Sequence, residues 1–157
     1  MVHARSSMLV RTAQPNDAAA VLALARRAHS ESVWADEAFS DERATATFYR
    51  IIADKHSIVL LLCDDKAVVG ILVGTLQLSY FSLDYDAVET LFYIDEQYRT
   101  LNNVRGIVKA YEYWARSMGA SATHPSMSQL KEAERITALY GKLGYGISAF
   151  VHRKVIQ

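Results

Sequence analysis

The pattern of apolar and polar positions changes along the chain from a helical period to a strand period and back. Three consecutive runs rich in β-branched and apolar residues predict strands: "HSIVLLLCD" (56–64), "KAVVGILVGTLQLSY" (66–80) and "AVETLFYID" (87–95). The tight turn "DDK" joins the first two runs, which predicts an antiparallel meander. Three other runs predict a first strand, a short strand or loop, and a final strand: "MLVRTA" (8–13), "ASATHP" (120–125) and "YGISAFVHRKVI" (145–156).

Segments with helical spacing alternate with these runs. They are "QPNDAAAVLALARRAHSES" (14–32), "SDERATATFYRIIADK" (40–55), the second half of 95–120, and "SQLKEAERITALYGKLG" (128–144). The resulting order is β-α-α-β-β-β-α-β-α-β, without repeats or an interdomain linker. It predicts a single α/β domain over 1–157, with residues 1–8 as a loose N-terminus. We expect a mixed, mostly antiparallel central sheet with helices on both faces.

Composition excludes several classes of function. The chain has 17 basic and 17 acidic residues, so it lacks the positive charge typical of proteins that bind nucleic acid or a membrane surface. Cys63 is the only cysteine and lies in an apolar run, and the five histidines have no metal-ligand spacing, so we expect neither a disulfide nor a metal site. No apolar run is long enough to span a bilayer. These features together predict a cytoplasmic protein.

The stretch "DEQYRTLNNVRG" (95–106) joins a predicted strand to a predicted helix. The free amides and the positive dipole at a helix start form an anion site, for which pyrophosphate is the obvious ligand. Arg99 before the turn and Arg105 in the first helical turn would add charge-assisted contacts. The alternative is a helix start that binds no ligand, with Asn102 or Asn103 as its N-cap.

The order of elements, together with "VETLFYIDEQYRTLNNVRGIVKAYEYWARSMGA" (88–120) and "ITALYGKLGYG" (136–146), resembles the GNAT (GCN5-related N-acetyltransferase) superfamily. The resemblance covers roughly residues 9–156. It implies the GNAT fold and direct transfer of an acetyl group from acetyl-CoA, as co-substrate, to a primary amine of a small molecule or a protein. It also leaves a homodimer open. The alternative is a weak or inactive GNAT-fold protein that acts as a protein-binding module.

The same resemblance implies where acetyl-CoA binds. The family turn reads Arg/Gln-x-x-Gly-x-Gly/Ala, in which Arg99 keeps the first place but Asn102 and Val104 replace the glycines. Asparagine tolerates left-handed backbone, so we expect Asn102 to keep the shape of the turn, whereas Val104 is expected to crowd the phosphate. The expected CoA-binding residues are Phe92, Tyr93 and Ile94 through their backbone, and Arg99, Thr100, Leu101, Asn102, Asn103, Val104 and Arg105.

Two residues are candidates for acid–base chemistry. Glu89, in the strand that leads into the turn, resembles the family's general base, and partial burial would raise its pKa; the alternative is a surface glutamate. Tyr140 matches the tyrosine that protonates the CoA sulfur in many members of the family; the alternative is a core tyrosine with a satisfied hydroxyl. The asparagine that usually precedes this tyrosine is replaced by Ala133, which indicates altered cofactor binding.

The acceptor side is expected between the first two helices. His29, Glu31 and Trp34 form a polar and aromatic set suited to an amine, and His29-x-Glu31-Ser32 is similar to a pattern in small phage-type members of the family. The alternative is a helix C-terminus, favourable for histidine, that is followed by a solvated loop. Tyr80, in the aromatic run "SYFSLDYDA", either lines the same cleft or packs within its hairpin.

Overall fold

The structure, a computed structural model, describes residues 8–126, 132–149, 151–154 and 156. Its strands are β1 (Met8–Thr12), β2 (Ser57–Asp64), β3 (Ala67–Leu78), β4 (Tyr85–Ile94) and β5 (Ala120–His124). Its helices are α1 (Ala18–Glu31), α2 (Asp41–Ala53), α3 (Leu101–Ser117) and α4 (Ala133–Lys142), with short 3-10 turns at Pro15–Asp17 and Glu96–Tyr98.

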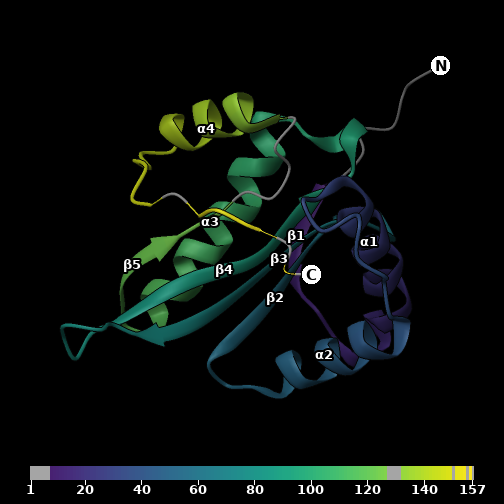
Figure 1. Cartoon of the computed structure of the whole chain (residues 1–157), viewed down its shortest axis with the longest axis horizontal. Coiled ribbons are helices and arrows are strands. Elements are labelled where there is room, and N and C mark those ends of the chain that lie inside the picture. Colours follow the sequence, from purple (N-terminus) through teal and green to yellow (C-terminus); the bar gives the residue numbers. More distant parts are fainter. Residues whose placement is uncertain (1–7, 127–131, 150, 155, 157) are drawn as a thin grey trace.

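The five strands form one sheet in the order β1-β2-β3-β4-β5, so each strand lies beside its neighbour in the sequence. The first three pairs are antiparallel, and β4 pairs with β5 in parallel. Figure 1 shows α1 and α2 on one side of the sheet and α3 with α4 on the other. The predicted α/β class, with a mixed sheet between helices, is confirmed.

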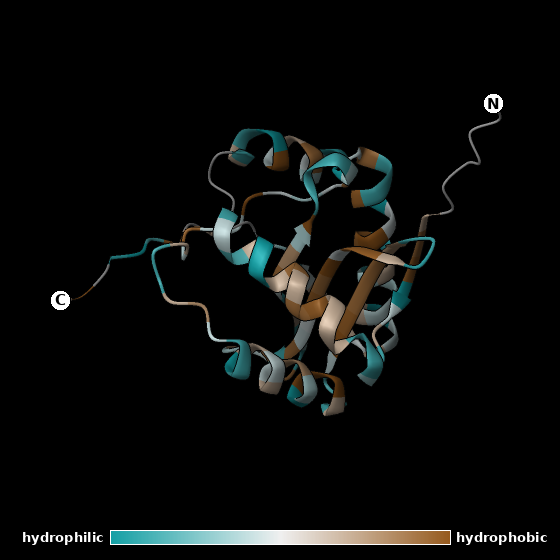
Figure 2. Ribbon diagram, turned by 90° about the vertical axis from the view of Figure 1, so that its right-hand side faces the viewer, coloured by the Kyte–Doolittle hydropathy of each residue, from teal (hydrophilic) through white to brown (hydrophobic). Residues whose placement is uncertain are grey.

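A separate hydrophobic core lies on each face of the sheet. Alternate residues of β2 point to opposite faces: Leu60 and Leu62 pack beneath α3, whereas Leu61 and Cys63 pack beneath α1 and α2. Figure 2 shows the hydrophobic strands enclosed between the helices. Because β2 is covered on both faces, its sequence is a continuous apolar run rather than an alternating one.

The sheet separates at one place, where β4 and β5 part. Their pairing ends at Val88 and His124, and Pro125 then follows, which has no backbone N–H to continue the ladder. Beside this point β4 bulges at Thr90, since the register with β3 shifts between Val73 and Gly74. We call residues 88–90 and 124–126 the fork. Beyond it, the second half of β4 has no β5 neighbour.

A close helix–strand contact supports the fork from the α3 side. Tyr111 and Trp114 of α3 stack with ring centroids 6.0 Å apart, and both rings lie against Gly74 of β3. A Cβ atom at Gly74 would lie 2.6 Å from Cε2 of Tyr111. Only glycine therefore lets α3 approach the sheet this closely.

The predicted final strand is wrong for the part of 145–156 that the structure describes. Residues 145–149 and 151–154 form no strand, and Ile147 and Val151 are exposed. The segment instead crosses to the loop after α1, where Arg153 donates to the carbonyl of Val33 at 3.2 Å and to Glu37 Oε1 at 2.7 Å. An alternating apolar pattern makes a strand only where a neighbouring strand is available.

Two smaller boundaries also differ from prediction. Met8 belongs to β1 rather than to a loose terminus, whereas residues 1–7 lie outside the described part. The predicted start of the fourth helix, 128–131, lies outside it as well, and the described helix begins at Ala133. Within the described ranges, no helix has the length and apolar character required to cross a membrane.

Candidate functional site

A cleft opens beside the unpaired half of β4, between the start of α3 and helix α4. Its wall is mostly apolar, and its polar groups come from the loop before α3, from the residue after Pro125, and from α4. The lining residues are Phe92, Tyr93, Ile94, Arg99, Val104, Ser126, Glu132, Arg135, Ile136, Leu139 and Tyr140. A mostly apolar cleft with a few convergent polar groups is typical of a small-molecule site.

Glu89 lies at the fork, directly behind the cleft. It is only 4% exposed, so the alternative of a surface glutamate is wrong. Its Oε2 accepts hydrogen bonds from the backbone N–H of Ser126 at 2.7 Å and from the Ser126 hydroxyl at 2.9 Å. Burial raises the pKa of the Glu89 carboxyl, while the two bonds from Ser126 oppose this rise by favouring the charged form.

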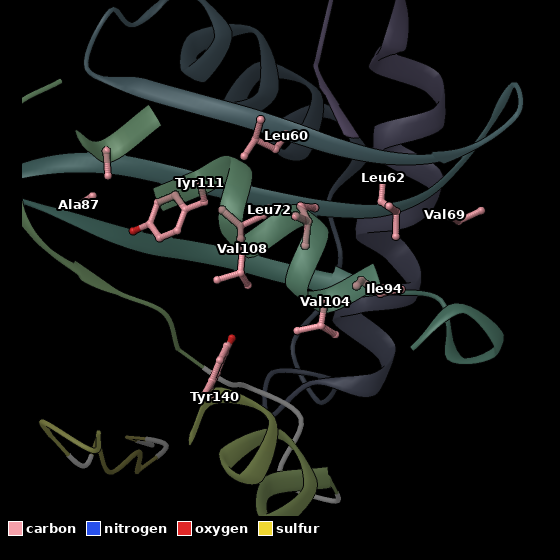
Figure 3. Close-up of a cluster of buried hydrophobic side chains, with 12 residues drawn as sticks. Leu60, Leu62, Val69, Leu72, Ala87, Ile94, Val104, Val108, Tyr111 and Tyr140 are labelled. Atoms are coloured by element: carbon pink, nitrogen blue, oxygen red, sulfur yellow. The ribbon is translucent and has the colours of Figure 1, made fainter. Parts of the chain in front are cut away.

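Tyr140 of α4 also contacts Ser126. Its hydroxyl donates to the backbone carbonyl of Ser126 at 3.1 Å, and Figure 3 shows its side chain pointing from α4 towards the cluster beneath α3. Burial, and then the negative charge of Glu89, raise the pKa of Tyr140, so it stays protonated at neutral pH. The hydroxyl is satisfied, as in the core alternative, and the residue also lines the cleft.

A second tyrosine fixes the ring of Tyr140. Tyr145 packs edge-on against it with ring centroids 5.7 Å apart. The Tyr145 hydroxyl donates to Glu112 Oε1 at 2.7 Å and lies 3.0 Å from the hydroxyl of Thr123. Burial is the main cause that raises the pKa of Tyr145 to about 12. These contacts connect α4 to both α3 and β5 and hold Tyr140 over the cleft.

Sequence reasoning missed two residues beside Glu89. Ser126 joins Glu89 to Tyr140, but a lone serine after a proline carries no signal in the sequence. Tyr111 of α3 has a buried hydroxyl that lies beside the backbone of His124. Burial, followed by the charge of Glu89, raises the pKa of Tyr111, so its hydroxyl stays protonated close to the carboxylate.

The start of α3 differs from the two expectations for its asparagines. Thr100 is the N-cap, since its hydroxyl accepts from the backbone N–H of Asn103 at 3.2 Å, so neither asparagine has that role. Asn102 lies within α3 rather than in a left-handed conformation; among described non-glycine residues only Asp65 has a positive φ. In the described part of the chain, the backbone N–H groups of Leu101 and Asn102 have no acceptor.

Val104 and Arg105 differ in their relation to the cleft. Val104 is 7% exposed and packs in the core with Leu72 and Ile94, while its outer surface lines the cleft. Val104, which stands where the family turn has glycine, therefore narrows the cleft and stabilises the core. Arg105 does not line the cleft and forms no ion pair within the described ranges.

Arg99 occupies the inner part of the cleft. Its Nε donates to the carbonyl of Ile94 at 2.6 Å, and its two terminal nitrogens contact Glu31 at 2.5 Å and Glu132 at 3.3 Å. The guanidinium also lies 5.2 Å above the centre of the Tyr93 ring. The side chain is thus held by the end of β4, by α1 and by the residue before α4.

Arg135 of α4 is a further cation that sequence reasoning missed. Its guanidinium donates to the carbonyl of Arg99 at 2.8 Å, beside the free amides at the start of α3. It is more than half exposed, so it is less constrained than Arg99. A basic residue five positions before Tyr140, on the same helix, is the signal that could have identified it.

Of the four residues expected to bind the acceptor, only Glu31 lies beside the cleft. Its Oε1 accepts from the Tyr93 hydroxyl at 2.6 Å, and it borders a shallow hollow at the end of β4. His29 packs edge-on against Phe39 with ring centroids 5.4 Å apart. Trp34 lies in the loop after α1.

Tyr80 is 97% exposed in the segment that joins β3 to β4, next to Phe81, which is fully exposed. It does not line the cleft. The alternative that Tyr80 packs within its hairpin does not fit either, because such an exposed ring buries almost no apolar surface. Among the described residues, no group of three or more potential ligands is arranged to hold a metal ion.

No model of a protein family matches the sequence, and a search of curated proteins finds no match either. Solved structures do match. An aminoglycoside N-acetyltransferase in complex with CoA gives a TM-score of 0.77 at 13% identity, over 100% of this chain and 99% of that chain. Glucosamine-6-phosphate N-acetyltransferase from Arabidopsis thaliana gives 0.75 at 12% identity, over 96% and 99%.

A transcriptional regulator from Bacillus halodurans gives a TM-score of 0.77 at 16% identity, over 96% of this chain and 100% of that chain. At such identities the likeness concerns the fold and not the activity. It extends over nearly the whole chain and includes several acetyltransferases. The chain therefore has the GNAT fold.

Proposed function

We propose that this protein is an N-acetyltransferase that moves an acetyl group from acetyl-CoA directly to a primary amine of a small molecule or a protein. One observation carries the proposal. A buried carboxylate, Glu89, and a protonated hydroxyl, Tyr140, are both hydrogen-bonded to Ser126 at the fork, beside an apolar cleft. Aminolysis of a thioester requires one base and one acid at the same place.

The cleft offers three kinds of group for acetyl-CoA, which would supply the activated acyl group. The half of β4 beyond the fork, including Phe92 and Ile94, has no β5 neighbour, so its free edge is available to the amides of a pantetheine arm. The free N–H groups of Leu101 and Asn102, together with the positive end of the α3 dipole, suit a pyrophosphate. Arg135 lies beside them and adds a positive charge.

Arg99 must change partners for this binding mode, because its Nε occupies the carbonyl of Ile94. We propose that the guanidinium turns from Ile94 towards the phosphates while the start of α3 stays in place. Glu31, released from Arg99, would then carry an unpaired negative charge at the hollow beside Tyr93. A negative charge at that position favours a cationic acceptor.

In the proposed reaction, the amine nitrogen bonds to the acetyl carbon and the carbon–sulfur bond breaks. Glu89, which lies behind Ser126, accepts the amine proton through a water, and Tyr140 donates a proton to the departing sulfur. Burial serves both roles. It raises the pKa of Glu89, which makes the ionised carboxylate a stronger base, and it keeps Tyr140 protonated. We place the reaction in the cytoplasm, where Cys63 would stay reduced.

Calorimetric titration with acetyl-CoA tests the proposal first. We expect micromolar binding that weakens as salt is raised, because part of it comes from ion pairs with phosphate. Release of free CoA thiol should then appear with at least one member of an amine panel that contains an aminoglycoside, glucosamine 6-phosphate and a lysine peptide. No binding at millimolar acetyl-CoA would contradict the proposal.

Replacing Tyr140 by phenylalanine is expected to lower kcat by about 10²-fold, because the general acid is lost while the ring is retained. The dissociation constant for acetyl-CoA should change less than threefold, roughly 0.6 kcal/mol. Steady-state kinetics and calorimetry measure the two quantities. Tyr113→Phe is the matched control, since this tyrosine of α3 is 74% exposed and lies outside the cleft. An unchanged kcat would remove Tyr140 from the mechanism.

A protein-binding module is the second candidate function. It is favoured by the ion pairs that hold Arg99 within the cleft and by Val104, which narrows it. Both features fit a cleft that is closed by its own side chains. The titration separates the two candidates, because a module without the co-substrate would bind no acetyl-CoA at any salt concentration.

A further inference from the structure

Within the part of the chain that the structure describes, Ser126 alone is hydrogen-bonded to both candidate catalytic groups. Its backbone N–H and its hydroxyl donate to the same oxygen of Glu89, at 2.7 and 2.9 Å, and its carbonyl accepts from Tyr140 at 3.1 Å. Three polar groups of a single residue are therefore used to hold the site. None of them is available to extend the sheet.

Its place in the chain explains why. His124 makes the last pair between β5 and β4, and Pro125 cannot donate a ladder hydrogen bond. The next N–H, that of Ser126, turns instead to the side chain of Glu89. The residue at which β5 leaves β4 is thus also the residue that binds the carboxylate.

Ser126 also separates Glu89 from the cleft. Ser126 is exposed and lines the cleft, whereas Glu89 is buried and does not. In the described part of the chain, the charge of Glu89 also raises the pKa of Tyr111 from α3 and of Tyr140 from α4, and both hydroxyls are neutral at ordinary pH. Opposite Glu89 on β3 lies Gly74, which has no side chain. Among the described residues, Ser126 therefore supplies both hydrogen bonds that the carboxylate accepts.

We propose that Ser126 is a positioning residue: its hydroxyl and N–H orient the Glu89 carboxylate and favour its ionised form, and its carbonyl aims the hydroxyl of Tyr140. This inference rests on the proposed function for its catalytic meaning. The effect of Ser126 on the titration of Glu89 can be measured without turnover.

The test compares Ser126→Ala and Ser126→Thr with the wild type in the full chain. The carboxyl carbons of glutamate are labelled with ¹³C, the Glu89 signal is identified by its absence in Glu89→Gln, and its titration is followed by NMR without acetyl-CoA. Loss of the hydroxyl removes a hydrogen bond to the charged form, so we expect Glu89 to titrate at higher pH in Ser126→Ala. Ser126→Thr keeps a hydroxyl and should restore the wild-type midpoint.

Kinetics provide the second measurement. At pH 7 kcat should fall about tenfold in Ser126→Ala, because the loss of one charge-assisted hydrogen bond has an effect of about that size. The pH at which kcat rises should shift upwards, and the KM for acetyl-CoA should stay within about twofold. Ser121→Ala is the matched control: this serine of β5 also donates to a carboxylate, Asp86, at 3.1 Å, but is exposed. It should change neither quantity.

The outcomes are distinguishable. An unmoved Glu89 titration in Ser126→Ala, or a Ser126→Thr variant that behaves like Ser126→Ala, overturns the inference. A shifted titration in a protein that acetylates no amine supports the control of Glu89 by Ser126 and counts against the proposed function instead. Thermal melting of each variant shows whether the fold is retained. If Ser126→Ala alone fails to fold, the comparison of Ser126→Thr with the wild type decides.

Discussion

Replacing Glu89 by glutamine is expected to lower kcat by about 10²- to 10⁴-fold, the range typical of a lost general base. Glutamine has nearly the same shape, and its amide oxygen can still accept from Ser126, so the fork should stay folded. The affinity for acetyl-CoA should be unchanged, since Glu89 does not line the cleft. Steady-state kinetics and calorimetry separate the two effects.

The pH dependence gives a sharper form of this prediction. Only the ionised carboxylate accepts a proton, so wild-type kcat should rise as pH increases through the pKa of Glu89, which burial raises. The rise attributable to Glu89 should be absent from Glu89→Gln. Asp86→Asn is the control on the same strand, because Asp86 pairs with His124 outside the cleft. A Glu89→Gln variant with full activity would show that another group is the base.

Replacing Gly74 by alanine is expected to destabilise the fold by about 1–3 kcal/mol, the usual cost of overpacking. The new Cβ would lie 2.6 Å from Cε2 of Tyr111 and 3.1 Å from Cζ3 of Trp114. Neither ring can move freely, because both belong to α3 and stack on one another. Chemical denaturation, followed by tryptophan fluorescence, measures the loss in the free energy of unfolding.

Gly141→Ala is the matched control for this prediction. Gly141 lies in α4, and apart from its chain neighbours and its own helix backbone, no described atom lies within 4 Å of the position of an added Cβ. Alanine also favours helix over glycine by roughly 1 kcal/mol, so this variant should be as stable as the wild type or slightly more stable. Equal stability of Gly74→Ala and the wild type would mean that α3 does not approach the sheet as closely as described.

The sequence predicted the fold well because its signals are local. Continuous apolar runs and the tight turn around Asp65 indicated β2 and β3, and helical spacing indicated the four helices. The final strand failed for a non-local reason: its alternation between 145 and 156 is that of a strand, but the segment contacts the loop after α1 instead of a sheet edge. A pattern of side chains does not specify the partner.

In the candidate site, too, the non-local contacts could not be predicted from the sequence. Glu89, Tyr140 and the residues at the end of β4 were predicted from a family resemblance, and the structure places Glu89 and Tyr140 on either side of one residue. Ser126 could not be predicted, because its contacts join residues 37 and 14 positions away. For Arg99 the sequence indicated a charge near the turn but not its bonds to Ile94 and Glu31.

The order of the strands in the sheet has a consequence for folding. Because every strand pairs with its neighbour in the sequence, the meander of β2, β3 and β4 closes only short loops and pays little entropy before contacts form. The parallel pair of β4 and β5 must wait for α3 between them, and Ser126 follows β5. We therefore expect the bonds between Ser126 and Glu89 to form after the meander, and hydrogen exchange should open the fork before the central strands.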